Sequence, residues 1–199
     1  MKNNRARDVK DKKRRRVITN IEGITIRLRD ICLDDLNVYR YWQQPGHDWQ
    51  AFDGPYYPKA TSEEVEENIK AIEAKIISDD WPKIRQRLMI ANRQSDKIIG
   101  SVSRYWISQE TNWSAVGIVI FDSASWGKGI GYEALGLWSD YLFTQFPDWV
   151  RLDLRTWSGN QGMIRLALKL GYSEEARFRK ARIVNGAYFD GLGFGILRN

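Results

Sequence analysis

The sequence has a single cysteine, Cys32, and a single histidine, His47. A disulfide within the chain is therefore impossible, and a structural zinc site, which usually takes four ligands of these types, is excluded. No cluster of acidic residues suggests magnesium, so we expect no metal. A Cys–His catalytic pair would need both single residues to meet, and Cys32 lies in a segment expected to enter a helix.

Long apolar runs are also missing. No stretch approaches the roughly 18 apolar residues of a membrane span. The N-terminus is basic, but no apolar segment of signal-peptide length follows it. We therefore expect a cytoplasmic protein with no membrane partner. Its 199 residues are 43% hydrophobic and 28% charged, the ordinary composition of one globular domain.

Charge is unevenly distributed along the chain. Residues 1–16 contain nine Lys or Arg and two Asp, which leaves 22 basic and 23 acidic residues in 17–199. We expect a disordered basic tail over 1–16 and one domain over 17–199. The tail fits a solubilising extension, or a handle for RNA, ribosomes or acidic surfaces. No aromatic residue interleaves with its charges, so nucleic acid is expected as a partner only through this tail.

Hydrophobic periodicity predicts a mixed α/β sheet with helices on both faces. Thr61 followed by Glu64 is a capping box, and Asn185-Gly186 favours a hairpin turn. Asn160 is a further N-cap signal. The expected strands are 24–28, 87–92, 97–107, 114–121, 150–156, 176–184 and 187–197, and the expected helices are 33–42, 61–78, 131–145 and a helix that begins after residue 160.

A glycine-rich loop lies between the expected strand 114–121 and the helix that follows it. Glycine lets a backbone approach a ligand closely, and the first N–H groups of a helix have no internal partners. With the helix dipole they form an anion site suited to phosphate. The residues expected to bind it are Trp126, Gly127, Lys128, Gly129, Ile130 and Gly131.

Two other phosphate motifs share these parts. A Walker A loop requires Ser or Thr after a Gly-Lys pair at fixed spacing, which is absent. The dinucleotide fingerprint requires a third glycine where Tyr132 stands, and it normally opens a domain, whereas this loop lies past the midpoint. A glycine-rich helix start without any ligand is the remaining alternative.

The stretch from Trp126 to Leu135 resembles the acetyl-CoA loop of the GNAT superfamily of N-acetyltransferases. Gly129 and Gly131 match the glycines of its Gln/Arg-x-x-Gly-x-Gly/Ala pattern. Trp126 stands where Gln or Arg is usual, as in the RimJ/RimL-type branch, which acetylates ribosomal-protein N-termini. A second similar block comprises Thr156-Trp-Ser-Gly-Asn160, Leu168-Lys-Leu-Gly-Tyr172 and Tyr188-Phe-Asp190. The resemblance covers about residues 24–198.

The resemblance implies a GNAT fold whose central sheet splays between its two middle strands, here about 115–121 and 150–156. Acetyl-CoA is the implied cofactor, with its pantetheine arm in the splay against the backbone of Val119, Ile120 and Phe121. Asn160 would hydrogen-bond the arm while it caps its helix. The implied activity is direct acetyl transfer, in a ternary complex, to a primary amine.

The acceptor would be a protein N-terminus, such as that of a ribosomal protein, or a small amine. The resemblance also leaves room for a homodimer. Aromatic residues in the segment Trp42–Tyr57 are expected to form the acceptor wall, where acidic neighbours could attract a cationic amine. The wall residues are Trp42, Trp49, Phe52 and Tyr56.

The positions that usually handle protons in this family are altered. Ala115 stands where a Glu is common before the strand glycine, and Met163 where a Ser is common after the capping Asn. A substitute base must come from a nearby segment: Glu110 before the strand, or Asp48, Asp53 or His47 in the aromatic loop. Of these we select Glu110 and Asp53, with Tyr188 as the candidate acid.

Two alternative functions therefore stay open. One is a CoA-binding protein whose catalysis is weakened, motivated by the altered positions. The other is a ribosome- or RNA-associated module that binds through its basic tail.

Overall fold

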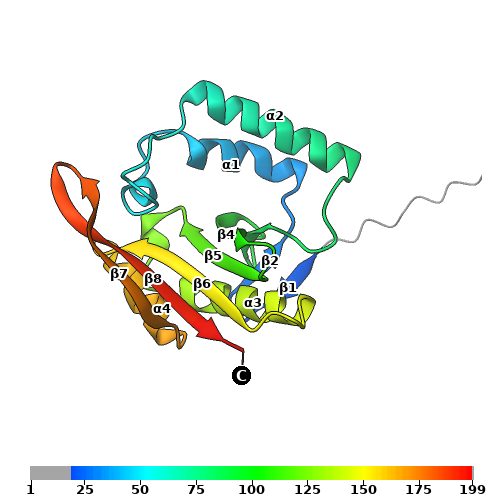
Figure 1. The fold of residues 1–199 in the computed structure, drawn as a ribbon. Coiled ribbons are helices and arrows are strands. Elements are labelled where there is room, and N and C mark those ends of the chain that lie inside the picture. Colours follow the sequence, from blue (N-terminus) through cyan, green and yellow to red (C-terminus); the bar gives the residue numbers. More distant parts are fainter. Residues whose placement is uncertain (1–18, 199) are drawn as a thin grey trace, which may run out of the picture.

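A computed structural model describes residues 19–198 (Figure 1). The proposed tail 1–16 lies outside the described residues, so the division of the chain at residue 16 stays a prediction. The strands are β1 Asn20–Glu22, β2 Ile26–Arg29, β3 Arg87–Asn92, β4 Ile98–Ser108, β5 Trp113–Ile120, β6 Arg151–Trp157, β7 Ser173–Val184 and β8 Ala187–Leu197. The helices are α1 Leu36–Gln43, α2 Ser62–Ser78, α3 Ile130–Gln145 and α4 Gln161–Lys169, with short 3-10 turns at Leu33–Asp35, Asp48–Ala51 and Ser123–Ser125.

The strands form one mixed sheet in the order β1-β2-β3-β4-β5-β6-β8-β7. Every neighbouring pair is antiparallel except β5 and β6, which are parallel and joined through α3. Helices α1 and α2 lie on one face, and α3 and α4 lie on the other (Figure 1). The mixed α/β sheet with helices on both faces that the sequence predicts is confirmed.

Each sheet face has its own hydrophobic core. On the α3 side, Leu135, Trp138 and Leu142 recur at helical spacing and are fully buried against the strands. On the other side, Tyr39 of α1 and Ile69 of α2 are buried with Phe121 and neighbouring residues of the sheet. These two cores hold the sheet between its helices and thereby fix the ends of β5 and β6.

Local signals in the sequence correctly placed several element ends. Thr61 accepts from the Glu64 N–H at 3.2 Å and donates its own N–H to the Glu64 carboxylate at 2.8 Å, which completes the capping box. Asn185 and Gly186 have φ of 50° and 79°, the conformation of the favoured hairpin turn. These positions follow from neighbouring residues alone, so sequence suffices to find them.

Other boundaries differ from expectation. The segment expected as one helix from Leu33 begins as a 3-10 turn, where the Asp35 carboxylate binds the Cys32 N–H at 2.9 Å. Strand β1 is too short to give a periodic signal. Strand β7 begins at Ser173 rather than 176, because it continues to pair with β8 on both sides of an irregularity near residue 175.

No helix among residues 19–198 combines the length and apolar character that crossing a membrane requires.

Candidate functional site

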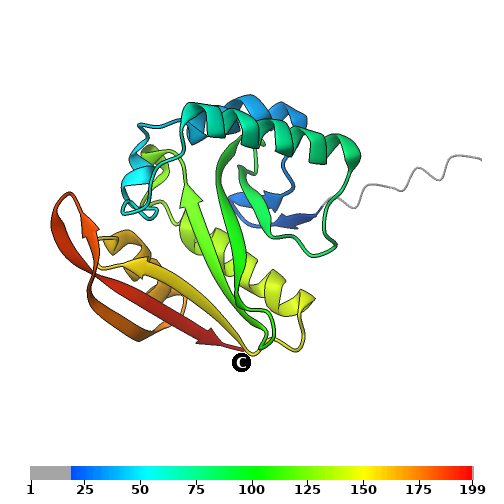
Figure 2. The ribbon, with the colours of Figure 1, turned by 45° about the horizontal axis from the view of Figure 1, so that its top comes forward.

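The central feature of the site is a fork between β5 and β6. The strands pair from Ser114↔Leu152 to Val116↔Leu154, and the pairing then ends. Beyond this point residues 117–120 remain paired with β4 only, and residues 155–157 with β8 only. Figure 2 shows the two strands diverging. We call the space between residues 117–120 and 155–157 the fork; its β5 side has backbone groups without a strand partner.

The register of β5 decides which backbone groups face the fork. The Phe121 N–H donates to the Ile99 carbonyl at 2.9 Å, toward β4. Alternate residues of an antiparallel strand turn their backbone groups to the same neighbour, so Val119 also faces β4. Ile118 and Ile120 therefore face the fork. Of the three residues expected to line it, Ile120 does so, while the backbone groups of Val119 and Phe121 point away.

The glycine loop lies where β5 leads into α3. Gly127 and Gly129 have φ of 73° and 84°, and a Cβ added at either would meet no atom within 4 Å. Helix α3 begins at Ile130 with no side-chain cap, so its first N–H groups stay open. Lys128 is exposed beside them. Gly131 has another role, because a Cβ there would lie 3.3 Å from Leu166 of α4.

Trp126 closes the end of the fork on the β5 side. Its indole N–H donates to the Ile120 carbonyl at 3.0 Å. Its ring meets the Phe52 ring edge to face, with centroids 5.4 Å apart. The residue that replaces the usual Gln or Arg therefore joins the glycine loop to the α1–α2 connection, residues 44–61.

Asn160 acts on the β6 side of the fork. Its side-chain oxygen accepts from the Met163 N–H at 3.0 Å, so its predicted N-cap role is confirmed. Its amide nitrogen donates to the Phe52 carbonyl at 3.2 Å, and the Trp157 indole donates to the same oxygen at 3.0 Å. Phe52 thus contacts both arms of the fork, the β5 side through its ring and the β6 side through its carbonyl.

The four aromatic residues expected in the acceptor wall fall into two groups. Trp42 and Trp49 pack on the buried Phe121 ring, each with its centroid 6.1 Å from that ring, and belong to the core under α1 and α2. Phe52 and Tyr56 instead reach the fork side, where Arg182 of β7 lies over the Tyr56 ring at 4.4 Å. Sequence could not separate these groups, since the irregular connection has no periodicity.

Asp53 follows Phe52 and lies near Arg87 of β3. Burial raises the pKa of the Asp53 carboxyl, and the attraction of Arg87 lowers it less. The Asp53 side chain is nonetheless exposed to solvent, and screening by water limits the size of this rise. Arg87 pairs with Ser103, which pairs with Gly117 at the mouth of the fork. Asp53 directly follows Phe52, whose carbonyl binds Trp157 and Asn160 on the β6 arm, and this neighbour places Asp53 beside the fork.

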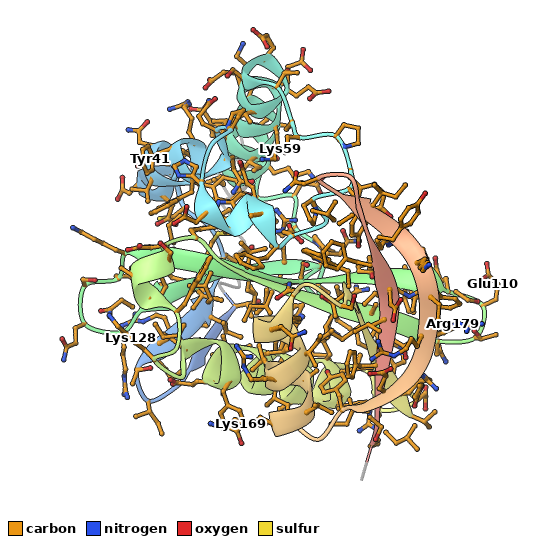
Figure 3. All side chains as sticks on the ribbon, turned by 90° about the vertical axis from the view of Figure 1, so that its left-hand side faces the viewer. Tyr41, Lys59, Glu110, Lys128, Lys169 and Arg179 are labelled. Carbon is orange, nitrogen blue, oxygen red and sulfur yellow. The ribbon has the colours of Figure 1, made fainter. Side chains whose placement is uncertain are left out.

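Glu110 is not brought to this site. It lies exposed in the β4–β5 turn, where its carboxylate accepts from the Ser108 hydroxyl at 3.1 Å. The eight residues of β5 separate that turn from the glycine loop, roughly 23 Å of strand. Figure 3 shows Glu110 and Lys128 at opposite ends of the molecule.

Tyr188 is also turned away from the fork. It pairs with Ile183, whereas Arg182 pairs with Phe189, so strand alternation places Tyr188 and Arg182 on opposite faces of the hairpin. Its side chain is 63% exposed. The expectation that Tyr188 supplies a proton at the fork does not fit this geometry.

Glu133, in the first turn of α3, is a residue that the sequence did not single out. Its carboxylate accepts the Thr25 N–H at 2.9 Å, and also the Ile24 N–H and the Thr25 hydroxyl. Partial burial raises its pKa, but these hydrogen bonds outweigh burial and lower it. The contact fixes the start of α3 against the β1–β2 turn. A local pattern could not reveal it, because the partners lie 108 and 109 residues away in sequence.

Within residues 19–198 no group of three or more His, Cys, Asp or Glu side chains is arranged to hold a metal ion.

Known proteins provide an independent comparison. The sequence matches the family described as Acetyltransferase (GNAT) domain over residues 25–173. Two Bacillus subtilis (strain 168) proteins are similar: the SPbeta prophage-derived uncharacterized N-acetyltransferase YokL, 27% identical over 109 residues, and the probable N-acetyltransferase YjcK, 32% identical over 108. The matches cover 55% and 54% of this chain but only 60% and 59% of those proteins.

Solved structures share the fold. A GNAT-family acetyltransferase from Bacillus anthracis has a TM-score of 0.70 at 15% identity, covering 90% of this chain and 98% of that one. A ribosomal-protein-S5-alanine acetyltransferase from Vibrio fischeri has 0.69 at 20%, covering 91% and 97%. The RimL ribosomal L7/L12 alpha-N-protein acetyltransferase in complex with coenzyme A has 0.67 at 17%, covering 90% and 98%. The family match spans most of the chain and includes both arms of the fork, and on that ground the chain belongs to the GNAT acetyltransferase family.

Proposed function

We propose that this chain is an acetyl-CoA-dependent N-acetyltransferase that acetylates a primary amine by direct transfer in a ternary complex. The observation that carries the proposal is the fork, whose pairing ends at Val116↔Leu154 directly before a glycine loop and the uncapped start of α3. Coenzyme A has an extended pantetheine arm and a pyrophosphate. The fork would bind the arm, and the adjacent start of α3 would bind the pyrophosphate.

The residues fit that coenzyme. Gly127 and Gly129 leave space where any side chain would stand, beside the open N–H groups of α3. Ile118 and Ile120 offer backbone groups to the arm as a strand partner would. The Asn160 amide nitrogen, which donates to the Phe52 carbonyl, lies at the β6 arm of the fork. When bound, acetyl-CoA supplies the acetyl group as a thioester.

The amine must lose a proton as its nitrogen bonds to the acetyl carbon and the carbon–sulfur bond breaks. We assign Asp53 as the base, since its raised pKa favours proton uptake and it lies toward the mouth of the fork. The Ile118 N–H would donate to the carbonyl oxygen as negative charge develops there. The Phe52 and Tyr56 side chains would restrict water around the amine.

The acceptor class is a primary amine, either a protein N-terminus or a small amine. Two of the structural relatives act, by their names, on ribosomal proteins, which supports a peptide N-terminus. The direct test incubates the full chain with acetyl-CoA and a panel of N-terminal peptides, amino sugars and polyamines. We expect release of free thiol matched one for one by acetylated acceptor in mass spectra.

One specific observation favours a second candidate, a CoA-binding protein with little catalysis. Ala115, fully buried in β5, and Met163 replace the side chains that usually handle protons in this family. That reading predicts binding of CoA without acetylation of any amine in the same panel, an outcome that would reject the proposed transferase.

A further inference from the structure

Four side chains line the sheet face beside the fork, on the side that α1 and α2 cover: Tyr56, Tyr105, Arg155 and Arg182. Tyr105 of β4 pairs with Ala115, which pairs with Asp153 of β6. Arg155 is two residues beyond Asp153 and so shares its face. Burial raises the pKa of the Tyr105 hydroxyl, and Arg155 lies close enough to oppose this. Tyr105 and Arg155 therefore face the same space.

Arg182 reaches this space from the β7–β8 hairpin. Its guanidinium lies over the Tyr56 ring at 4.4 Å, and its Nε lies 3.8 Å from where a Cβ on Gly191 would stand. Gly193, two residues along β8, pairs with Arg155. Positions two apart on a strand lie roughly 7 Å from each other. Gly191, which the Arg182 side chain approaches, and Gly193, which pairs with Arg155, are two apart, so the two arginines border neighbouring parts of β8.

Neither arginine is neutralised within residues 19–198. The carboxylates closest to them in the sheet have other partners: Asp153 and Glu175 pair with Arg151 at 2.5 and 2.6 Å, and Asp190 pairs with Arg177 at 2.8 Å. No ion pair of the described residues includes Arg155 or Arg182, and the buried Arg182 Nε has no hydrogen-bond partner. Two cations thus border one surface: Arg182 lies over the Tyr56 ring, and Arg155 is exposed with its guanidinium 5.9 Å from the centroid of the Trp113 ring.

Charge on this surface selects among amines. Asp53, which lies near Arg87, would attract the ammonium group at the mouth of the fork. The two arginines lie on β6 and β7, Arg182 over the Tyr56 ring that Asp53 also influences, and they would repel a second cation there. A guanidinium pair instead binds a carboxylate or phosphate strongly, and neighbouring neutral tyrosine hydroxyls can donate to the same group.

We propose that the acceptor is zwitterionic: besides its amine it carries an anionic group, a carboxylate or a phosphate, which Arg155 and Arg182 bind. The proposal rests on the proposed function and narrows its acceptor class. It disfavours polyamines and favours an N-terminal peptide with an early acidic residue, or a small amine that carries a carboxylate or phosphate. The two sources share one recognition chemistry and differ only in the molecule that presents it.

Matched acceptors test the proposal. The C-terminally amidated peptides Ala-Glu-Ala-Ala, Ala-Gln-Ala-Ala and Ala-Lys-Ala-Ala carry a negative, a neutral and a positive second side chain and no other carboxylate, and glucosamine 6-phosphate differs from glucosamine by one phosphate. We expect the full chain to acetylate the anionic member of a series with kcat/KM at least tenfold above the neutral one, about the effect of one charge-assisted hydrogen bond. The series with the larger ratio identifies the source of the anion. Equal kcat/KM within both series would overturn the proposal.

Variants locate the preference. R155Q, R182Q and the double variant should reduce it stepwise, and R182E should shift it toward Ala-Lys-Ala-Ala. R179Q, on the exposed irregularity of β7 away from the fork, is the matched control and should keep the full preference. Circular dichroism melts check that each variant is folded. A preference that survives in the double variant would reject the assignment.

Calorimetric binding separates this inference from the transferase itself. The same peptides are titrated into the wild type and the double variant in the presence of CoA, at low and high salt. Tighter binding of Ala-Glu-Ala-Ala by the wild type alone, weakened by salt, supports the proposal even where no acetyl group is transferred. Equal binding of the three peptides contradicts it, whereas loss of turnover on every amine rejects only the proposed function.

Discussion

The Phe52 carbonyl accepts the Trp157 indole N–H at 3.0 Å, and this bond attaches the α1–α2 connection to the C-terminal end of β6. Asn160 donates to the same oxygen, while the Phe52 ring rests on Trp126 beyond the end of β5. One residue therefore joins the proposed acceptor wall to both arms of the fork. A substitution at this junction should therefore alter the binding of both the acceptor and the coenzyme.

Trp157→Phe removes the indole donor and keeps an aromatic ring. We expect unfolding free energy to fall by about 1 kcal/mol, the usual net contribution of one hydrogen bond, and KM for the amine to rise as the connection loosens. Trp81→Phe is the matched control, since the buried Trp81 indole N–H has no hydrogen-bond partner among residues 19–198. An unchanged amine KM in Trp157→Phe, with chemical denaturation equal to that of the control, would contradict the junction's role.

Gly129→Ala tests the glycine loop. At φ of 84° an alanine costs about 1–2 kcal/mol, and its methyl group would occupy the space assigned to the coenzyme. We expect weaker CoA binding by calorimetry, and its loss in Gly129→Glu, which adds a negative charge at the pyrophosphate position. Gly136→Ala, inside α3 with ordinary contact distances, is the control and should retain affinity. Unchanged affinity in Gly129→Glu would remove the coenzyme from this loop.

Asp53→Asn tests the proposed base. Loss of general-base catalysis typically costs about 100-fold or more, so kcat/KM should fall by that order and lose its acidic limb. Asp48→Asn, in the same connection, keeps an oxygen for the Ser123 hydroxyl and should preserve the rate. A rate for Asp53→Asn within twofold of the wild type would show that the proton leaves by another route.

Asp53→Asn should raise the stability of the folded chain at pH 7 although it lowers the rate. The pKa of Asp53 is higher in the folded chain than its unfolded value of about 3.9, so the folded state holds the proton more tightly. Ionisation of Asp53 therefore costs stability above the folded pKa, and the cost disappears below pH 3.9. Melting curves should show Asp53→Asn more stable than the wild type at pH 7, with the difference shrinking in acid. An Asp53→Asn variant less stable than the wild type at pH 7 would contradict a raised pKa of Asp53 in the folded chain.

Glu133→Gln tests how α3 is positioned. The pKa of Glu133 is lower in the folded chain than its unfolded value of about 4.3, so its stabilisation is present above that pH and is lost as pH falls through the folded pKa. The variant should melt earlier at pH 7 and converge with the wild type in acid. Glu73→Gln, at an exposed position of α2, should show neither effect. A constant difference at all pH values would exclude the charge as the cause.

Glu110→Gln should leave kcat/KM unchanged, because the side chain lies in an exposed turn at the far end of β5 from the glycine loop. Acetyl-transfer kinetics with the best acceptor provide the check. A large loss of rate would return this residue to the list of candidate bases.

The sequence predicted those features that depend on nearby residues. The glycine loop, the Asn160 cap and the Thr61 capping box each follow from a few consecutive positions, and all three lie where expected. The sheet class followed in the same way, since each strand and helix has its own periodicity.

Features that depend on register or on distant segments could not be predicted. Whether Ile118 or Val119 faces the fork depends on how β5 pairs with β4, and one residue of slippage reverses the answer. The face of Tyr188 likewise depends on hairpin register. Arg155, Arg182 and Tyr105 come from three strands, and the Glu133 contact joins residues more than a hundred positions apart, so no local pattern marked them.

Amide hydrogen exchange at single-residue resolution, measured by NMR with and without CoA, tests the fork most directly. We expect CoA to protect the amides of Ile118 and Ile120, which face the fork. The amides of Val119 and Phe121, already bonded toward β4, should change little. CoA binding with no added protection at Ile118 and Ile120 would contradict the claim that the fork between β5 and β6 is where the coenzyme arm binds.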